Sequence, residues 1–162
     1  MFSEPAPLKT VDHVDLARYL GKWYEIARYP NRFEKSCTSD VIADYARGDD
    51  GKITVTNACR KSGGKSKESK GTAKVVDTSS NAKLKVTFFW PFSGDYWVID
   101  LDPDYKYAVI GEPDRKYLWV LSRTPELAPE VYERIMGKVR ELGYDPAKLV
   151  KTPQGQRDNA AH

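Results

Sequence analysis

The sequence predicts an all-β fold: an eight-stranded antiparallel up-and-down β-barrel with one C-terminal α-helix packed outside it. Short runs of alternating apolar and polar residues recur about every 10 residues between Lys22 and Leu121, with turn residues between them. A late run is apolar on both faces, and an amphipathic segment follows it. The 162 residues fit one domain. We expect an N-terminal extension at 1–13, the barrel domain at 14–152 and a disordered tail at 153–162.

Eight runs are predicted as strands, at about 22–29, 39–47, 51–60, 68–76, 82–90, 95–101, 105–112 and 116–122. Asp50 and Gly51 tolerate the positive φ of a tight hairpin turn and therefore predict one between the second and third runs. The short links predict that strands adjacent in sequence pair with each other, as in a meander.

The helix is predicted at residues 129–142. Trp97 and Ile99 alternate with Tyr96 and Val98, so both faces of the sixth strand are apolar and its outer face needs a cover. The segment that follows the strands carries apolar residues at helical spacing, namely Val131, Ile135, Val139 and Leu142.

Alternation also assigns the inner face of the barrel, because successive side chains of a strand point to opposite sides. Lys83, Lys85 and Thr87 are expected outside. The predicted ligand contacts are mainly apolar, with several rings and one amide: Ala27, Val41, Ala43, Tyr45, Val55, Asn57, Val75, Val86, Phe88, Trp90, Tyr96, Val98, Tyr117 and Trp119. Glu25 and Asp100 share the inward parity, and a buried carboxylate must be paired or neutralised.

Composition argues against several classes of function. A net charge of +3 is too small to suggest a nucleic-acid partner. His13 and His162 are the only histidines, and no cluster has metal-ligand spacing, so we predict no metal and no cofactor. No apolar run is long enough for a membrane-spanning helix. The first eight residues lack the pattern of a secretory signal, which leaves a removed signal open.

Three motifs resemble the signature blocks of the lipocalin family, in order and at the expected strands: Gly21-Lys22-Trp23, Asp104-Tyr105 and Arg123. The residues around the first and third blocks, Tyr24–Arg28 and Tyr117–Pro125, are similar to the bacterial and apolipoprotein D-like branch. The resemblance implies structural roles. Trp23 would plug the closed end under the Arg123 guanidinium, Gly21 would allow close approach of the chain, and Asp104-Tyr105 would shape a turn there.

Cys37 and Cys59 are the only cysteines. The hairpin turn at Asp50 and Gly51 places Cys59 opposite about residue 42, so Cys37 reaches it only if the preceding loop bends back. We expect one disulfide, with two buried thiols as the alternative. A disulfide fits an exported protein, which would be periplasmic or associated with the outer membrane in a bacterium and secreted otherwise.

Binding and transport or storage of a fatty acid, lysophospholipid or similar lipid is the leading hypothesis for function, without catalysis. Two alternatives are a tetrapyrrole carrier for haem or bilin, which would lack an inward histidine, and a lipid-modifying enzyme that uses Glu25 or Asp100. A basic stretch is interpreted as a solvated hairpin or as a contact with an anionic membrane surface: Lys61, Lys65, Lys67, Lys70 and Lys74. The oligomeric state stays open.

Overall fold

The structure is a computed structural model that describes residues 6–31, 35–48, 50–89 and 92–154, without the side chains of residues 88–89 and 92–93. Of the predicted tail, residues 155–162 lie outside the described residues. None of the helices in the described ranges is long and apolar enough to cross a membrane.

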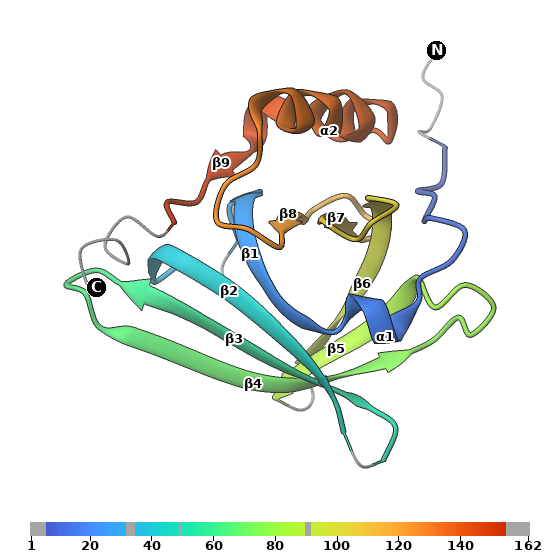
Figure 1. The fold of residues 1–162 in the computed structure, drawn as a ribbon, viewed down its shortest axis with the longest axis horizontal. Coiled ribbons are helices and arrows are strands. Elements are labelled where there is room, and N and C mark those ends of the chain that lie inside the picture. Colours follow the sequence, from blue (N-terminus) through green and yellow to red (C-terminus); the bar gives the residue numbers. More distant parts are fainter. Residues whose placement is uncertain (1–5, 32–34, 49, 90–91, 155–162) are drawn as a thin grey trace.

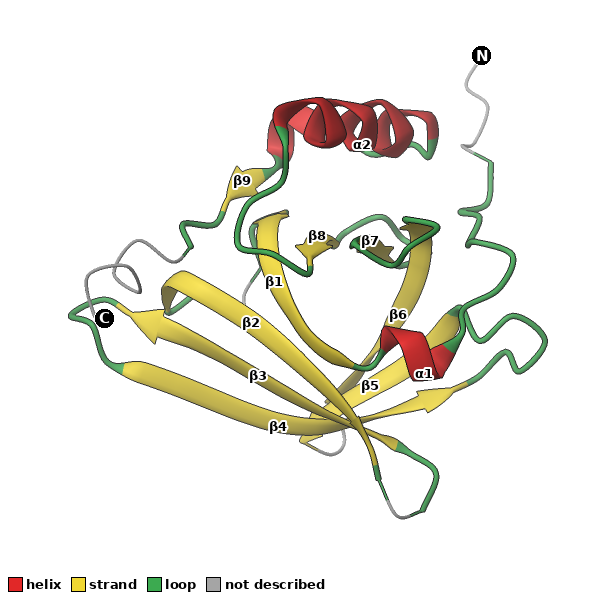
Figure 2. Ribbon diagram, in the orientation of Figure 1, coloured by secondary structure: helices red, strands yellow, loops and turns green. Residues whose placement is uncertain are grey.

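Eight antiparallel strands form a closed barrel in which neighbours in sequence pair, and β1 pairs with both β8 and β2 to close the ring (Figures 1 and 2). The predicted fold class is confirmed. The strands are β1 (Gly21–Arg28), β2 (Cys37–Arg47), β3 (Ile53–Lys61), β4 (Ser66–Val75), β5 (Lys83–Phe89), β6 (Phe92–Leu101), β7 (Tyr107–Gly111) and β8 (Leu118–Ser122).

The last barrel strand begins later than expected because Glu112 organises the turn before it. Its carboxylate accepts hydrogen bonds from the backbone N–H groups of Asp114, Lys116 and Tyr117. Those N–H groups are therefore used within the turn rather than in the sheet. Tyr117 consequently precedes β8 instead of lying in it.

The helix α2 (Pro129–Glu141) packs on the outside of the barrel, as predicted (Figure 1). Its fully buried Ile135 and Val139 join one apolar cluster with Ile99, Val109 and Val120 from the sheet. Since β7 is buried along its whole length, the barrel wall is apolar on both faces where the helix covers it. The second, inner cluster contains Trp23, Tyr45, Val55, Val98 and Leu121.

Two β-bulges change which side chains face inward. The β1–β8 register shifts between Glu25 and Ala27, and Ala27 then lies opposite Val120 in the cluster under α2. The prediction that Ala27 contacts a ligand in the barrel is therefore wrong. A bulge admits one extra residue, which reverses the alternation beyond it.

The same reasoning corrects the position of Asp100. The β6–β7 register shifts between Val98 and Asp100, which brings Asp100 opposite Val109 on the outer face. Burial raises the pKa of Asp100, and the charges of Lys138 and Arg134 on α2 partly offset this rise. Asp100 therefore faces the helix instead of the barrel interior.

The seam between β1 and β2 is paired only at one end, where Gly21–Tyr24 meets Tyr45–Ile42. Beyond Tyr24 the chain that follows α2 completes the wall. After the short helix η2 (Pro146–Lys148), β9 (Val150–Lys151) pairs with β1 (Figure 1). The Gln154 amide then donates to the carbonyl of Glu25 in β1 and to that of Val41 in β2, each at 2.8 Å.

Candidate ligand-binding lumen

One end of the barrel is closed by contacts around Trp23, which is fully buried. The Arg123 guanidinium lies 3.8 Å above the Trp23 ring and donates to the carbonyls of Lys22 and Arg18, at 2.9 and 2.7 Å. Gly21 has φ +103°, and a side chain there would touch Arg123. These contacts join β1 to α1 (Leu16–Tyr19), which lies across this end (Figure 1).

The turn between β6 and β7 is held against the same end. The Tyr105 hydroxyl accepts a hydrogen bond from the backbone N–H of Asp15 at 2.8 Å. The backbone carbonyl of Tyr105 accepts one from the Arg123 guanidinium at 3.3 Å. Within the turn, the N–H of Asp104 donates to the Asp102 carboxylate. The chain before β1 is thus anchored to the β6–β7 turn at the closed end.

Three tyrosines meet on the floor of the interior. The Tyr96 hydroxyl lies 2.6 Å from that of Tyr19 and 2.8 Å from that of Tyr45. Burial raises the pKa of Tyr45 to about 12, and burial likewise raises the pKa values of Tyr19 and Tyr96. All three are therefore neutral at ordinary pH. Tyr19 is absent from the predicted set because it belongs to α1, outside the alternating strands.

The space above these rings at the closed end is small. A cavity of about 10 Å³ remains, close to the size of one water molecule. Its lining comes from the chain before β1 as well as from the strands: Val14, Leu16, Tyr19, Tyr45, Ile53, Ala73, Asn81, Leu84, Val86, Tyr96 and Val98. A ligand of lipid size therefore has to lie above the floor, towards the other end.

The predicted interior residues fall into three groups. Some are buried in the inner wall, namely Val41, Ala43, Tyr45, Val55 and Val98. Others keep part of their surface exposed, namely Asn57, Val75, Val86, Tyr96, Tyr117 and Trp119. Phe88 has no described side chain and Trp90 lies outside the described residues. The Tyr117 and Trp119 rings stack with centroids 5.7 Å apart.

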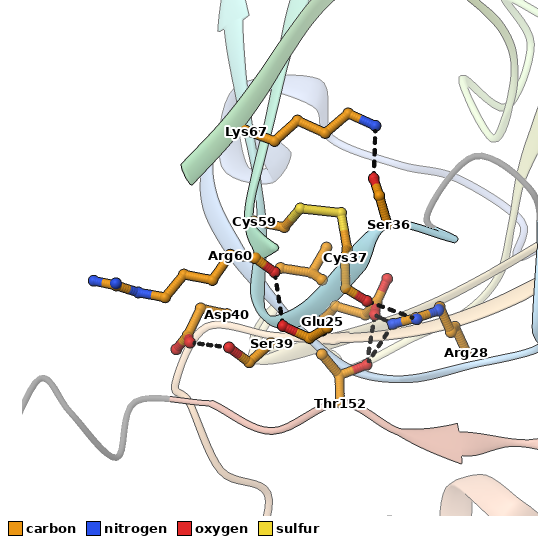
Figure 3. Close-up of a disulfide and its surroundings, with 12 residues drawn as sticks. Glu25, Arg28, Ser36, Cys37, Ser39, Asp40, Cys59, Arg60, Lys67 and Thr152 are labelled. Atoms are coloured by element: carbon orange, nitrogen blue, oxygen red, sulfur yellow. Dashed lines mark hydrogen bonds and ion pairs between the residues drawn. A yellow bond between two sulfur atoms is a disulfide. The ribbon is translucent and has the colours of Figure 1, made fainter. Parts of the chain in front are cut away.

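The second end of the barrel is the mouth, and it contains a buried ion pair. The Glu25 carboxylate accepts from Arg28 at 2.9 Å and from the Thr152 hydroxyl at 2.5 Å, and Glu25 is only 2% exposed (Figure 3). Beyond the β1 bulge, Arg28 lies opposite the inward Trp119, so the Arg28 side chain extends from the inner face of the barrel wall. Glu25 thus holds the wall together through charge-assisted hydrogen bonds.

Cys37 and Cys59 form a disulfide at the mouth, with Cα atoms 5.7 Å apart, which confirms the prediction (Figure 3). Two register shifts in β2, on either side of Ser39, bring Cys37 opposite Lys61 and next to Cys59. Cys37 therefore reaches Cys59 because of bulges within β2, whereas the sequence predicted that the preceding loop bends back. The neighbouring Ser36 hydroxyl accepts a hydrogen bond from Lys67 at 3.1 Å.

Within the described ranges, no group of three or more His, Cys, Asp or Glu side chains could hold a metal ion. His13 is exposed and precedes α1.

Comparison with known proteins agrees with this architecture. Residues 14–154 match the family model described as a lipocalin-like domain. The chain is 43% identical over 160 residues to temperature-induced lipocalin-1 of Arabidopsis thaliana, covering 94% of this chain and 86% of that protein. It is 40% identical over 156 residues to the outer membrane lipoprotein Blc of Escherichia coli K12, covering 94% and 88%.

The fold also matches solved structures. Insecticyanin from the tobacco hornworm Manduca sexta superposes with a TM-score of 0.75 at 24% identity, covering 94% of this chain and 87% of that one. The match extends over the barrel and the outer helix. The chain therefore belongs to the lipocalin family, whose barrels bind and carry small hydrophobic molecules.

Proposed function

We propose that this lipocalin binds and carries a single-chain lipid, such as a fatty acid or lysophospholipid, in the upper part of its barrel. One observation carries the proposal: two apolar inward side chains, Val86 at the edge of the floor cavity and Trp119 opposite Arg28 near the mouth, stay only half-buried. The described side chains leave part of the surface of both residues exposed. Each CH₂ that moves there from water contributes about 0.8 kcal/mol, so a long acyl chain offsets the cost of association.

We propose binding without catalysis. Of the two acids that could have served an enzyme, Glu25 is engaged by Arg28 and Thr152, and Asp100 faces α2. Neither is placed as a general acid or base towards the lumen. A lysophospholipid incubated with the protein should be recovered chemically intact. A product that disappears in Glu25→Gln would contradict this.

A tetrapyrrole is the competing ligand, and the stacked rings of Tyr117 and Trp119 favour a flat molecule. Among the described residues, haem would find no imidazole on the inner wall, since His13 is exposed and precedes α1. Purified protein with visible absorbance would favour a bilin or haem over a lipid.

The disulfide supports a site of action outside the reducing cytoplasm. We propose an exported protein, and the relative from Escherichia coli is by name an outer membrane lipoprotein. Exposed lysines on the β3–β4 hairpin, including Lys61, Lys65 and Lys70, would favour transient contact with an anionic membrane. Co-sedimentation with anionic but not neutral vesicles, weakened by salt, is the expected result.

The lumen itself is tested with Val86→Asp, because an unpaired charge in an apolar cavity is costly. Titration with oleate, followed by tryptophan fluorescence, should show affinity at least about tenfold weaker. The control is Lys74→Glu, an exposed position beside Lys85 on the outer wall, which should bind as the wild type does.

Thermal unfolding of the same variants separates loss of binding from loss of the fold. Val86→Phe is a second variant that fills the space without adding charge, and it should also weaken oleate binding. Full binding by both Val86 variants, or loss of binding in Lys74→Glu alone, would place the ligand outside the barrel.

A further inference from the structure

The lysine at position 67 does not belong to the solvated face of its hairpin. Exposed residues alternate with less exposed ones along β4, and Lys67 has the same parity as Ala73, which lines the floor cavity. The β3–β4 register is regular from end to end and places Lys67 opposite the buried Cys59. Lys70, by contrast, is exposed on the outer wall.

The inner wall becomes polar towards this lysine. Starting from the floor, β3 and β4 present the pairs Ile53 with Ala73 and Val55 with Gly71. The next inward pair is Asn57 with Ser69, and Lys67 follows at the mouth. A ligand with an apolar tail and a polar head would match this gradient in only one direction, with its head at Lys67.

The Lys67 ammonium is paired with a hydroxyl rather than with an acidic side chain. Arg28 and Glu25 form an ion pair and cancel each other. The Lys67 ammonium donates to the Ser36 hydroxyl, which is neutral, and no ion pair joins it to a carboxylate of the part of the chain that the structure describes. Figure 3 shows this ammonium pointing over the disulfide towards Ser36. Within the described residues, the Lys67 ammonium therefore lies at the rim of the lumen without a carboxylate partner.

We propose that Lys67 and Ser36 form an anion site that takes the carboxylate or phosphate head of a lipid whose tail lies in the barrel. The inference rests on the proposed function and specifies its ligand as an anionic amphiphile. The ammonium and the hydroxyl both donate hydrogen bonds to the head group, and charge-assisted bonds of this kind are the stronger ones.

The disulfide positions this site. Ser36 directly precedes Cys37, and Cys59 lies opposite Lys67 in the sheet. The bond thus connects the strand beside the lysine to the residue beside the hydroxyl. Without it, the Ser36 hydroxyl is free to move away from the ammonium.

The test compares oleate with oleyl alcohol, which has the same hydrocarbon chain and no charge. Lys67→Met should weaken oleate binding about tenfold and change oleyl alcohol binding less than about twofold. Lys67→Arg should retain most of the preference for oleate. Cys37→Ser with Cys59→Ser should lower this preference by a smaller factor. Lys85→Met, at an exposed position on the outer face of the neighbouring strand β5, should leave both affinities unchanged.

The outcomes separate the two proposals. If the wild type binds neither molecule, the lumen proposal fails and this inference fails with it. If the wild type binds both and Lys67→Met weakens them equally, or Lys85→Met has the same effect as Lys67→Met, the anion site alone is refuted. Inorganic phosphate is compared with chloride at equal ionic strength. Specific displacement of oleate by phosphate would show that Lys67 and Ser36 bind a free anion, and it would refute their role in binding a lipid head group.

Discussion

Tyr96 is the residue on which the floor of the barrel depends, because its hydroxyl joins those of Tyr19 and Tyr45. A buried hydroxyl that loses its partner keeps the full cost of desolvation. The three groups are also neutral only while their pKa values stay above the ambient pH. Stability at the floor is therefore sensitive both to substitution and to alkali.

Tyr96→Phe should lower the free energy of unfolding by about 1–3 kcal/mol, since it leaves two buried hydroxyls unpaired. Tyr24→Phe on β1 removes a hydroxyl outside this cluster and is the matched control. Urea unfolding of both variants measures the difference. Equal stability of the two variants would show that the cluster contributes little.

Stability should also fall in alkali with a definite sign. In the unfolded chain tyrosine ionises near pH 10, whereas burial raises the pKa of Tyr45 to about 12 and also raises those of Tyr19 and Tyr96. Between these values the unfolded state binds fewer protons, so stability is retained below about pH 10 and is lost as the pH rises towards 12. Unfolding curves across this range, compared with Tyr96→Phe, should show a shallower loss in the variant.

At the scale of the element, the regular stretches of the strands were predictable, and the positions at and beyond the bulges in β1 and β6 were not. The β3–β4 pair keeps one register throughout, so alternation assigned Val55 correctly to the inner wall. The bulges in β1 and β6 fall at Ile26 and Ile99, where two apolar residues follow each other and the pattern does not show which one is extra. Ala27 and Asp100 were misplaced for that reason.

Other parts of the site were missed for different reasons. The inward position of Lys67 could have been predicted, because Lys67 has the same strand parity as the buried Ala73. The neighbouring lysines instead suggested that the whole hairpin is solvated. Tyr19 gave no signal, because a short helix before the first strand has too few residues to show a period. The pairing of Cys37 with Cys59 was predicted, and only its cause was different.

The disulfide links β2 to β3 covalently. It spans a sequence separation of 22 residues, for which the chain-entropy argument gives about 3 kcal/mol. Cys37→Ser with Cys59→Ser should lower the free energy of unfolding by about that amount. Wild-type protein unfolded in the presence of a reductant should show the same free energy of unfolding as the variant. If the unfolding midpoint is unchanged in both experiments, the disulfide does not stabilise the fold.

At the scale of the whole molecule, the eight strands leave the seam between β1 and β2 unpaired beyond Tyr24. Residues 150–154 lie against β1, and the N–H of Thr152 donates to the carbonyl of Ile26 at 2.9 Å. The carbonyl of Pro153 accepts from the N–H of Asp40 in β2. This segment therefore connects the two strands that separate beyond Tyr24.

A chain that ends at Val150 should be less stable by about 2–4 kcal/mol, because Glu25 loses one hydrogen-bond donor and several backbone groups lose their partners. A chain that ends at Gln154 keeps these contacts and is the control. Thermal unfolding and urea titration should distinguish the two. Identical curves would mean that the segment lies on the wall without supporting it.

The seam between β1 and β2 also sets an order of events during biosynthesis. β1 emerges from the ribosome early, but the residues that join its outer half to β2 emerge only after the rest of the barrel and α2. Glu25 cannot gain its Thr152 partner before then. The ring is therefore completed only once residue 154 is outside the ribosome, and until that moment the nascent chain remains open along one side.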